Sequence, residues 1–279
     1  MTQFRVGPFE PIAEGIYLAV AEPAGVNVGL VVGPEGALVI DTGSSPEQGA
    51  AIRAAAEAVA GVPVTAVVVT HWHYDHLFGL AGFTGVASFG HENLTAWLSR
   101  PEAHHDAAEL GVDPTSLVAP NTTFALAKVI DAGGRRVEAL HFGPAHTDGD
   151  VVVFVPDAGV VFVGDLLESA DDPSFGPDCH LRDWPVALDG ILGMTRAESV
   201  IIPGHGPAMD RMDAFDQRSR ISALYGQVEF VINQGKLVDD AYEAAEWPFT
   251  EATVRTALPV AYAQFAAAGV TPKRQLPLV

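Results

Sequence analysis

One short segment constrains this chain more than any other. Residues 71–76 read His-Trp-His-Tyr-Asp-His and follow directly on residues 65–70, an apolar run rich in β-branched side chains. Such a run predicts a buried strand. Imidazole nitrogens and carboxylate oxygens are the usual ligands of zinc and its first-row neighbours. In an extended backbone His71 and His73 point to the same side, and a turn after them brings the last two ligands to the same cavity. The segment therefore predicts ligands for two adjacent metal ions.

Three further potential ligands also follow short apolar runs, namely His146, Asp165 and His205. Taken singly, a histidine or aspartate after a strand is more often a turn or capping residue than a ligand. Together with the first segment, however, four strand ends carry seven side chains of the type that binds borderline metals. This accumulation is difficult to explain without a metal site.

The chain alternates between strand and helix patterns. A helix is predicted over residues 46–60, capped by Ser44 or Ser45 and closed by Gly61. Short apolar runs predict strands over residues 15–20, 26–32, 37–40, 65–70, 86–89, 137–141, 151–155, 160–163 and 200–202. Strands that alternate with helices and end in ligands indicate an α/β layer arrangement.

Two segments break this pattern. Residues 91–120 contain several prolines and acids, and they form either a wall or lid of the site or a solvated helical excursion. Residues 208–275 have a helical pattern. Those helices pack on the rest of the chain or form a homodimer contact, or they cap one wall of the pocket. Three aromatic residues that neighbour the ligands are candidates for lining a substrate slot or for core packing, namely Trp72, Tyr74 and Phe142.

Composition narrows the classes of partner. The formal charge of the 279 residues is -20, and only three are lysines, so nucleic acid and anionic membrane surfaces are not expected partners. No apolar stretch is long enough to span a bilayer, and the first residues lack a secretory signal pattern. Cys179 is the single cysteine, so no intrachain disulfide forms. We expect a cytoplasmic enzyme that acts on a small-molecule substrate.

The order of the seven ligand-type residues, with Asp41-Thr42-Gly43 after an early strand, resembles the metallo-β-lactamase-fold hydrolase superfamily. The resemblance implies an α/β fold, a four-layer αβ/βα sandwich over residues 1–210 with the site at one edge. Residues 211–279 then form a C-terminal helical extension packed on it. The resemblance also assigns His71, His73 and His146 as ligands of one metal ion. It assigns to the other ion the ligands Asp75, His76 and His205. Asp165 would bridge both ions, and Asp41 would orient the histidine cluster.

The resemblance implies a dinuclear-metal hydrolase. Two divalent ions share a hydroxide that is nucleophilic at neutral pH. Zn²⁺ is the expected metal, with Mn²⁺ or Fe²⁺ as alternatives, and Asp75 would orient the hydroxide or carry its proton. An ester, a thioester, a lactone or a related bond is the expected target.

Two departures argue against β-lactamase activity. Asp165 stands where many zinc β-lactamases have a cysteine, and Glu168 stands where many have a lysine that holds the substrate carboxylate. Two other functions remain open. Persulfide dioxygenases of the same fold resemble this pattern but use one iron, whereas non-catalytic scaffold members lose ligands, and none is missing here.

Overall fold

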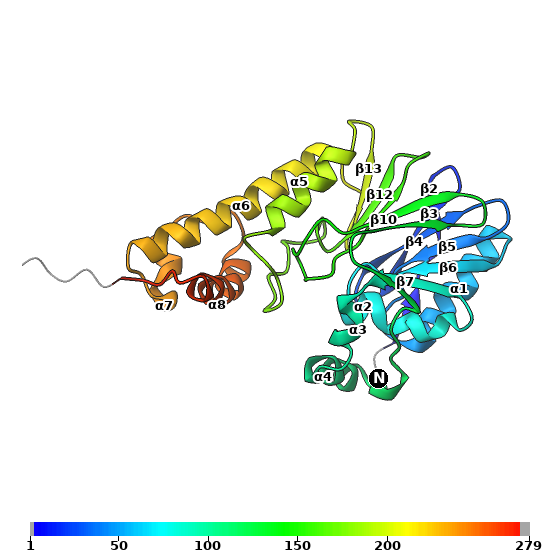
Figure 1. Ribbon diagram of the computed structural model, residues 1–279, viewed down its shortest axis with the longest axis horizontal. Coiled ribbons are helices and arrows are strands. Elements are labelled where there is room, and N and C mark those ends of the chain that lie inside the picture. The colour runs from blue at the N-terminus through cyan, green and yellow to red at the C-terminus, as the bar shows by residue number, and fades with distance from the viewer. Residues whose placement is uncertain (1–2, 274–279) are drawn as a thin grey trace, which may run out of the picture.

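The computed structural model describes residues 3–273 and contains two β-sheets that pack face to face (Figure 1). The first sheet has the strand order β1-β3-β4-β5-β6-β7-β8, with β2 paired to β3. Its strands are β1 (Arg5–Val6), β2 (Glu10–Ala13), β3 (Ile16–Glu22), β4 (Val26–Val32), β5 (Ala37–Ile40), β6 (Val64–Val68), β7 (Ala87–His91) and β8 (Thr122–Phe124). Strands β1 to β5 pair antiparallel, and β5 to β8 pair parallel.

The second sheet has the order β13-β12-β11-β10-β9. Its strands are β9 (Ala127–Asp131), β10 (Arg136–Leu140), β11 (Val152–Val155), β12 (Val160–Gly164) and β13 (Val200–Pro203). The predicted hairpin β11–β12 is confirmed, and β13 adds to it in parallel after a helical crossover. This crossover places the ends of β12 and β13 side by side.

Alternate residues of the central strands face opposite apolar layers, as the period of two requires. On β5, Leu38 and Ile40 belong to the core between the sheets, whereas Val39 packs on the side that holds Ile52 of α1 (Pro46–Ala60). On β12 the same alternation divides the residues between the inter-sheet core and a core formed with helices α5 and α6. Helices therefore cover both outer faces, and the predicted αβ/βα sandwich is confirmed.

Helix α1 begins and ends as its sequence predicts. The hydroxyl of Ser45 accepts a hydrogen bond from the backbone N–H of Gln48 at 3.1 Å, and Gly61 ends the helix in the left-handed region at φ 68°. The short elements after β6 are α2 (Tyr74–Leu77) and η1 (Phe78–Phe83). The 91–120 segment forms α3 (Asn93–Trp97), α4 (Pro101–Leu110) and η2 (Pro114–Ser116).

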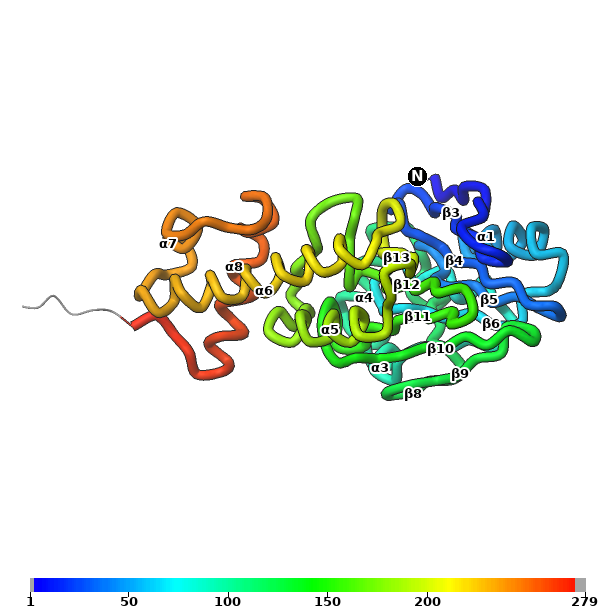
Figure 2. Tube along the Cα trace, turned by 90° about the horizontal axis from the view of Figure 1, so that it is seen from above, coloured from blue at the N-terminus to red at the C-terminus, as the bar shows by residue number. Residues whose placement is uncertain are grey.

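The C-terminal helices form an arm that extends away from the sheets, as Figures 1 and 2 both show. They are α6 (Arg211–Asn233), α7 (Val238–Ala241), η3 (Tyr242–Ala244) and α8 (Glu251–Ala267), whereas α5 (Trp184–Met194) is the crossover helix between β12 and β13. One continuous apolar cluster joins β11 and β12 to α5, α6 and α8. A domain boundary at residue 210 remains a prediction, and residues 274–279 lie outside the described part of the chain. No helix within residues 3–273 is long and apolar enough to cross a membrane.

Two details of the strand prediction were wrong. Strand β6 ends at Val68, so His71 and His73 lie in the following loop and the alternation of a strand does not orient them. Strands β1, β2, β8 and β9 and helix α5 were not predicted. Helix α5 is apolar on several sides and contains Gly190 and Gly193, so its sequence lacks the one-sided pattern of a surface helix.

Candidate metal centre

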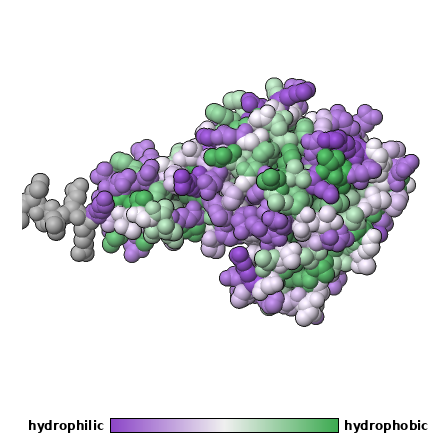
Figure 3. Space-filling model, in the orientation of Figure 1, coloured by the Kyte–Doolittle hydropathy of each residue, from purple (hydrophilic) through white to green (hydrophobic). Residues whose placement is uncertain are grey.

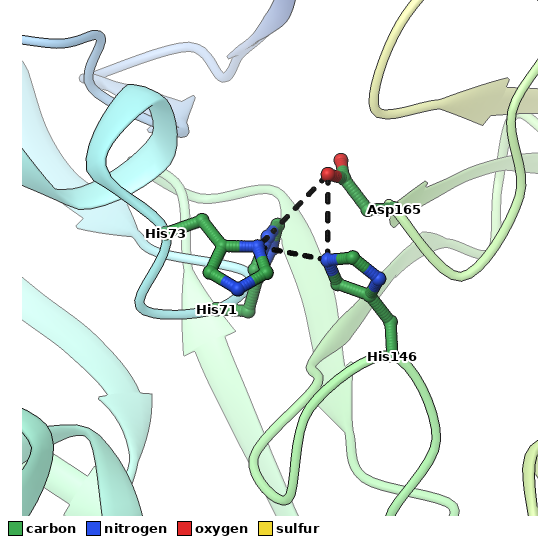
Figure 4. A group of neighbouring side chains, drawn as sticks. All are labelled: His71, His73, His146 and Asp165. Atoms are coloured by element: carbon green, nitrogen blue, oxygen red, sulfur yellow. Dashed lines mark hydrogen bonds and ion pairs between the residues drawn. The ribbon is translucent and has the colours of Figure 1, made fainter. Parts of the chain in front are cut away.

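Four predicted ligands from three separate loops meet at one end of the sandwich (Figure 4). His73 Nδ1 lies 3.1 Å from His71 Nε2 and 2.8 Å from His146 Nε2. Asp165 Oδ2 lies 3.6 Å from His71 Nε2 and 3.5 Å from His146 Nε2. Each of the four residues thus turns one ligand atom toward the same point.

The remaining three predicted ligands form a second group beside the first. His205 Nε2 lies 3.2 Å from Asp75 Oδ2, and His76 Nε2 lies 3.6 Å from the same oxygen. Asp165 Oδ1 lies 3.1 Å from His76 Nε2 and 3.6 Å from His205 Nε2. The two carboxylate oxygens of Asp165 therefore face different groups, which is the arrangement a bridging ligand requires.

Backbone geometry makes room for this carboxylate. Asp165 follows directly on β12, and Gly204 follows on the adjacent parallel strand β13. A Cβ atom at Gly204 would lie 1.8 Å from Asp165 Oδ1. Only glycine lets the end of β13 approach so closely, and it leaves His205 directly beside the carboxylate.

The chemistry of the two groups fits metal ions. Within residues 3–273, His76 Nε2 and Asp165 Oδ1 are buried and lie 3.1 Å apart, but they form a hydrogen bond neither with each other nor with another group. Such an arrangement is costly unless a ligand satisfies both atoms. Burial and the neighbouring His73 lower the pKa of His146 to about 4, and burial and His76 lower the pKa of His71. The neutral imidazoles of His71 and His146 keep the free lone pair that a metal requires. Neighbouring carboxylates outweigh burial and raise the pKa of His73, His76 and His205, so these rings would release a proton when they bind a metal.

Asp41 holds the second group from behind, in the place that the resemblance implied. Its Oδ2 lies 2.8 Å from His76 Nδ1, and its Oδ1 accepts a hydrogen bond from the Thr70 backbone N–H at 2.8 Å. The Thr70 hydroxyl lies 3.0 Å from His71 Nδ1. Such contacts to the outer ring nitrogen fix the tautomer and orientation of a metal-binding histidine.

Asp178 is a site residue that the sequence did not reveal. Its Oδ2 lies 3.0 Å from His73 Nε2 and accepts a hydrogen bond from Trp72 Nε1 at 3.0 Å. Burial opposes its ionisation, but the contact with His73 outweighs it and lowers the pKa of Asp178 to about 2. Asp178 lies in an irregular segment, so no periodicity marks it. The neighbouring Cys179 is buried against Gln264 and belongs to neither ligand group.

The two groups open into a cavity of about 560 Å³. Besides ligands, its lining includes Tyr74, Asp106, Glu168, Asp171, Asp172 and Asp178. A neighbouring cavity of about 440 Å³ shares His73, Asp106 and Asp178 and adds Trp97, Arg100 and Glu102. The 91–120 segment therefore forms a wall of the site. Of the three candidate aromatic residues, Tyr74 reaches the cavity, whereas Trp72 stacks on Trp97 and Phe142 packs beside Gly190.

Glu168 is a second residue of the cavity whose position needed the structure. Its side chain is buried and lies next to Asp165 and His205. Burial and the nearby Asp165 raise the pKa of Glu168 to about 10. Without a nearby cation this carboxyl therefore holds its proton at neutral pH.

Residues 21–212 match the sequence model of the metallo-beta-lactamase superfamily. The chain belongs to this superfamily. One curated relative is a metallo-beta-lactamase type 2 of Bacillus sp. (strain 170). It is 26% identical to this chain, and the match covers 53% of this chain and 54% of the relative. An acyl-coenzyme A thioesterase MBLAC2 of Gallus gallus is 27% identical over 64% of the chain and 72% of the relative. The chain thus spans about half the length of the first of these relatives.

Solved structures agree with the family. A metallo-beta-lactamase from Pontibacter korlensis superposes with a TM-score of 0.63 at 25% identity, covering 79% of this chain and 99% of that protein. This superposition covers a larger share of the chain than the sequence matches to the two curated relatives do. The superfamily fold is therefore established.

Proposed function

We propose that this protein is a hydrolase that uses two divalent metal ions, expected to be Zn²⁺, to cleave an ester, thioester, lactone or related bond of a small molecule. The observation that carries the proposal is the divided carboxylate of Asp165, with Oδ2 facing one ligand group and Oδ1 the other. His71, His73 and His146 would hold one ion, and Asp75, His76 and His205 the other.

When bound, the two ions would supply an activated water and polarise the scissile carbonyl. The residues of the chain supply orientation and proton transfer. Asp75 lines the cavity, and its Oδ2 lies 3.2 Å from His205 Nε2. We propose that this carboxylate orients a water at the cavity floor and takes its proton as the bond to the carbonyl carbon forms.

The side chains that line the cavity limit which substrates of the superfamily fit this site. No lysine or arginine lines it among the described residues, so a substrate carboxylate like that of a β-lactam finds no basic side chain there. The phosphates of an acyl-coenzyme A also lack one inside the cavity. The thioesterase relative supports cleavage of an acyl bond, and we propose acyl substrates with a different carrier group.

Metal analysis combined with a substrate screen tests the proposal. The purified protein is loaded with zinc or manganese and assayed on thioesters, lactones, β-lactams, sulfate esters and phosphodiesters. We expect two metal ions per chain and hydrolysis of an acyl bond, both lost in His73→Ala and Asp165→Ala. His105→Ala is the matched control, because His105 is exposed on α4 and its Nε2 lies 3.4 Å from Glu109 Oε1, outside both ligand groups. One iron per chain with oxygen uptake on a persulfide would instead indicate the dioxygenase.

A further inference from the structure

The cavity over the metal centre is lined by more carboxylates than metal binding uses. Beyond the ligands Asp75 and Asp165, it is lined by Asp106, Glu168, Asp171, Asp172 and Asp178. Figure 3 shows hydrophilic side chains around the hollow between the helical arm and the lobe that contains α4. Acidic lining alone does not define a binding site. A carboxylate can bind a ligand only if no other group of the protein already pairs with it.

Two of these carboxylates already have partners. Asp178 contacts His73 Nε2 and Trp72 Nε1. Asp172 pairs with Arg220 at 3.0 Å and accepts a hydrogen bond from the Thr250 backbone N–H. In contrast, the carboxylates of Asp106, Glu168 and Asp171 have no ion pair with any lysine or arginine of residues 3–273. These three acids are the ones available to a ligand.

Glu168 is distinct among the three because it is buried. Only 8% of its surface is exposed, it lines the cavity, and its carboxylate lies within 4.8 Å of ligand atoms of Asp165 and His205. The backbone N–H of His205 donates a hydrogen bond to this carboxylate, and no side chain of residues 3–273 does so. A carboxylate in such a place is costly without a cation beside it.

The backbone of Glu168 is fixed from the helical arm. Gln217 of α6, itself only 5% exposed, accepts a hydrogen bond from the Glu168 N–H at 2.9 Å and donates one to its C=O at 2.7 Å. The indole N–H of Trp184 donates to the C=O of Leu166 at 3.1 Å in the same segment. The turn that carries Glu168 is therefore held rigidly, as a specificity residue requires.

We propose that Glu168 binds a positively charged nitrogen of the substrate, with Asp106 and Asp171 adding a negative field at the mouth of the cavity. The substrate class is then an acyl compound with an ammonium group near the scissile carbonyl. This inference rests on the proposed function. Two divalent ions would carry one positive charge more than Asp75, Asp165 and a bound hydroxide offset, and this charge would keep the nearby Glu168 ionised. Asp106 and Asp171 then leave the mouth of the cavity electronegative.

Matched esters test the proposal directly. The 4-nitrophenyl esters of 4-(trimethylammonio)butanoate, 5,5-dimethylhexanoate and 4-sulfobutanoate have similar shapes and carry a positive, a neutral and a negative end. We expect kcat/KM of the zinc-loaded protein to be about 10- to 100-fold higher for the cationic than for the neutral ester, and lowest for the anionic one. The preference should fall as salt is added. Equal rates for the cationic and neutral esters would overturn the proposal while leaving the hydrolase function intact.

Glu168→Gln identifies the residue responsible. We expect this variant to keep its two metal ions and to lose most of the cationic-to-neutral ratio of kcat/KM. Asp239→Asn is the control, since it makes the same change of net charge on exposed α7 away from the cavity. A lost metal ion in Glu168→Gln would instead make Glu168 a metal ligand and overturn the proposal, as would an unchanged ratio.

A binding measurement separates the inference from the hydrolase function. Calorimetry on the metal-loaded protein compares choline with 3,3-dimethylbutan-1-ol, its neutral isostere. We expect choline to bind more tightly to the wild type by about 10-fold and to lose this advantage in Glu168→Gln. Tighter choline binding without turnover of any ester would reject the proposed function alone, whereas equal binding of the two alcohols would reject the cation site.

Discussion

Gln217 and Glu168 are 49 residues apart, and the amide side chain of the first bonds to both backbone groups of the second, at 2.9 and 2.7 Å. Helix α6 is otherwise part of the arm that extends away from the sheets (Figure 2). This buried side chain connects the arm to the cavity, as does the ion pair between Arg220 of the same helix and Asp172 of the cavity lining. The C-terminal helices thereby contribute to the shape of the site as well as to its packing.

Gln217→Leu should therefore destabilise the protein and loosen the cavity wall. Two buried backbone groups lose their partner, and we expect the free energy of unfolding to fall by about 2 to 4 kcal/mol, with each unpaired group costing on the order of 1–3 kcal/mol. Denaturant unfolding measures the loss. Ser219→Ala, two residues along the same helix and bonded only to the C=O of Phe215, is the control and should change stability little. A Gln217→Leu variant as stable as the control would contradict this role.

Asp178→Asn should weaken metal binding without removing a ligand. The amide cannot hold His73 with the charge of a carboxylate, and loss of such an outer partner typically lowers metal affinity about 10- to 100-fold. Competition with a zinc chelator measures the affinity. Asp183→Asn lies in the same segment and contacts no ligand, so its affinity should match the wild type. If Asp178→Asn binds zinc as tightly, Asp178 does not position His73.

Gly204→Ala should disrupt the bridging position. The added Cβ would lie 1.8 Å from Asp165 Oδ1, so the carboxylate or the end of β13 must move. We expect metal content below two ions per chain and loss of hydrolysis, while circular dichroism stays close to the wild type. Gly193→Ala in α5 is the matched control because no atom lies within 4 Å of its added Cβ, and alanine favours a helix. Full metal occupancy in Gly204→Ala would show that the close approach is not needed.

Removal of the metal should lower stability as well as activity. The ions would satisfy His76 Nε2 and Asp165 Oδ1, which are buried and form no hydrogen bond within residues 3–273. Free zinc at about 100 times its dissociation constant should raise the free energy of unfolding by about 2.7 kcal/mol. Thermal unfolding with and without a chelator checks this. A melting temperature indifferent to zinc would indicate that these side chains do not bind it.

Much of the fold could be predicted because local pattern and global packing agree. Strand β5 alternates between two cores, and helix α1 has its cap at Ser45 and its stop at Gly61. The seven ligand-type residues were also recognisable, since each follows an apolar run and each has a side chain suited to a metal. Their convergence in space agrees with that interpretation.

The features that the sequence did not predict depend on contacts between distant parts of the chain. Asp178 reaches His73 across 105 residues, and an aspartate in an irregular segment has no sequence pattern that marks this partner. Gly190 in α5 weakened the helical pattern, yet it lets the helix approach Phe142, whose Cδ1 would be 2.4 Å from an added Cβ. Such pairings are decided by packing, and neither residue type nor spacing reveals them.

The most direct test of the dinuclear site is metal stoichiometry measured alongside hydrolysis in the wild type and in Asp165→Ala. The divided carboxylate of Asp165 predicts two metal ions per chain in the wild type, with both the second ion and acyl-bond hydrolysis lost in the variant. A wild-type protein that binds a single ion at saturation, or an Asp165→Ala variant that keeps two ions and full turnover, would contradict the account.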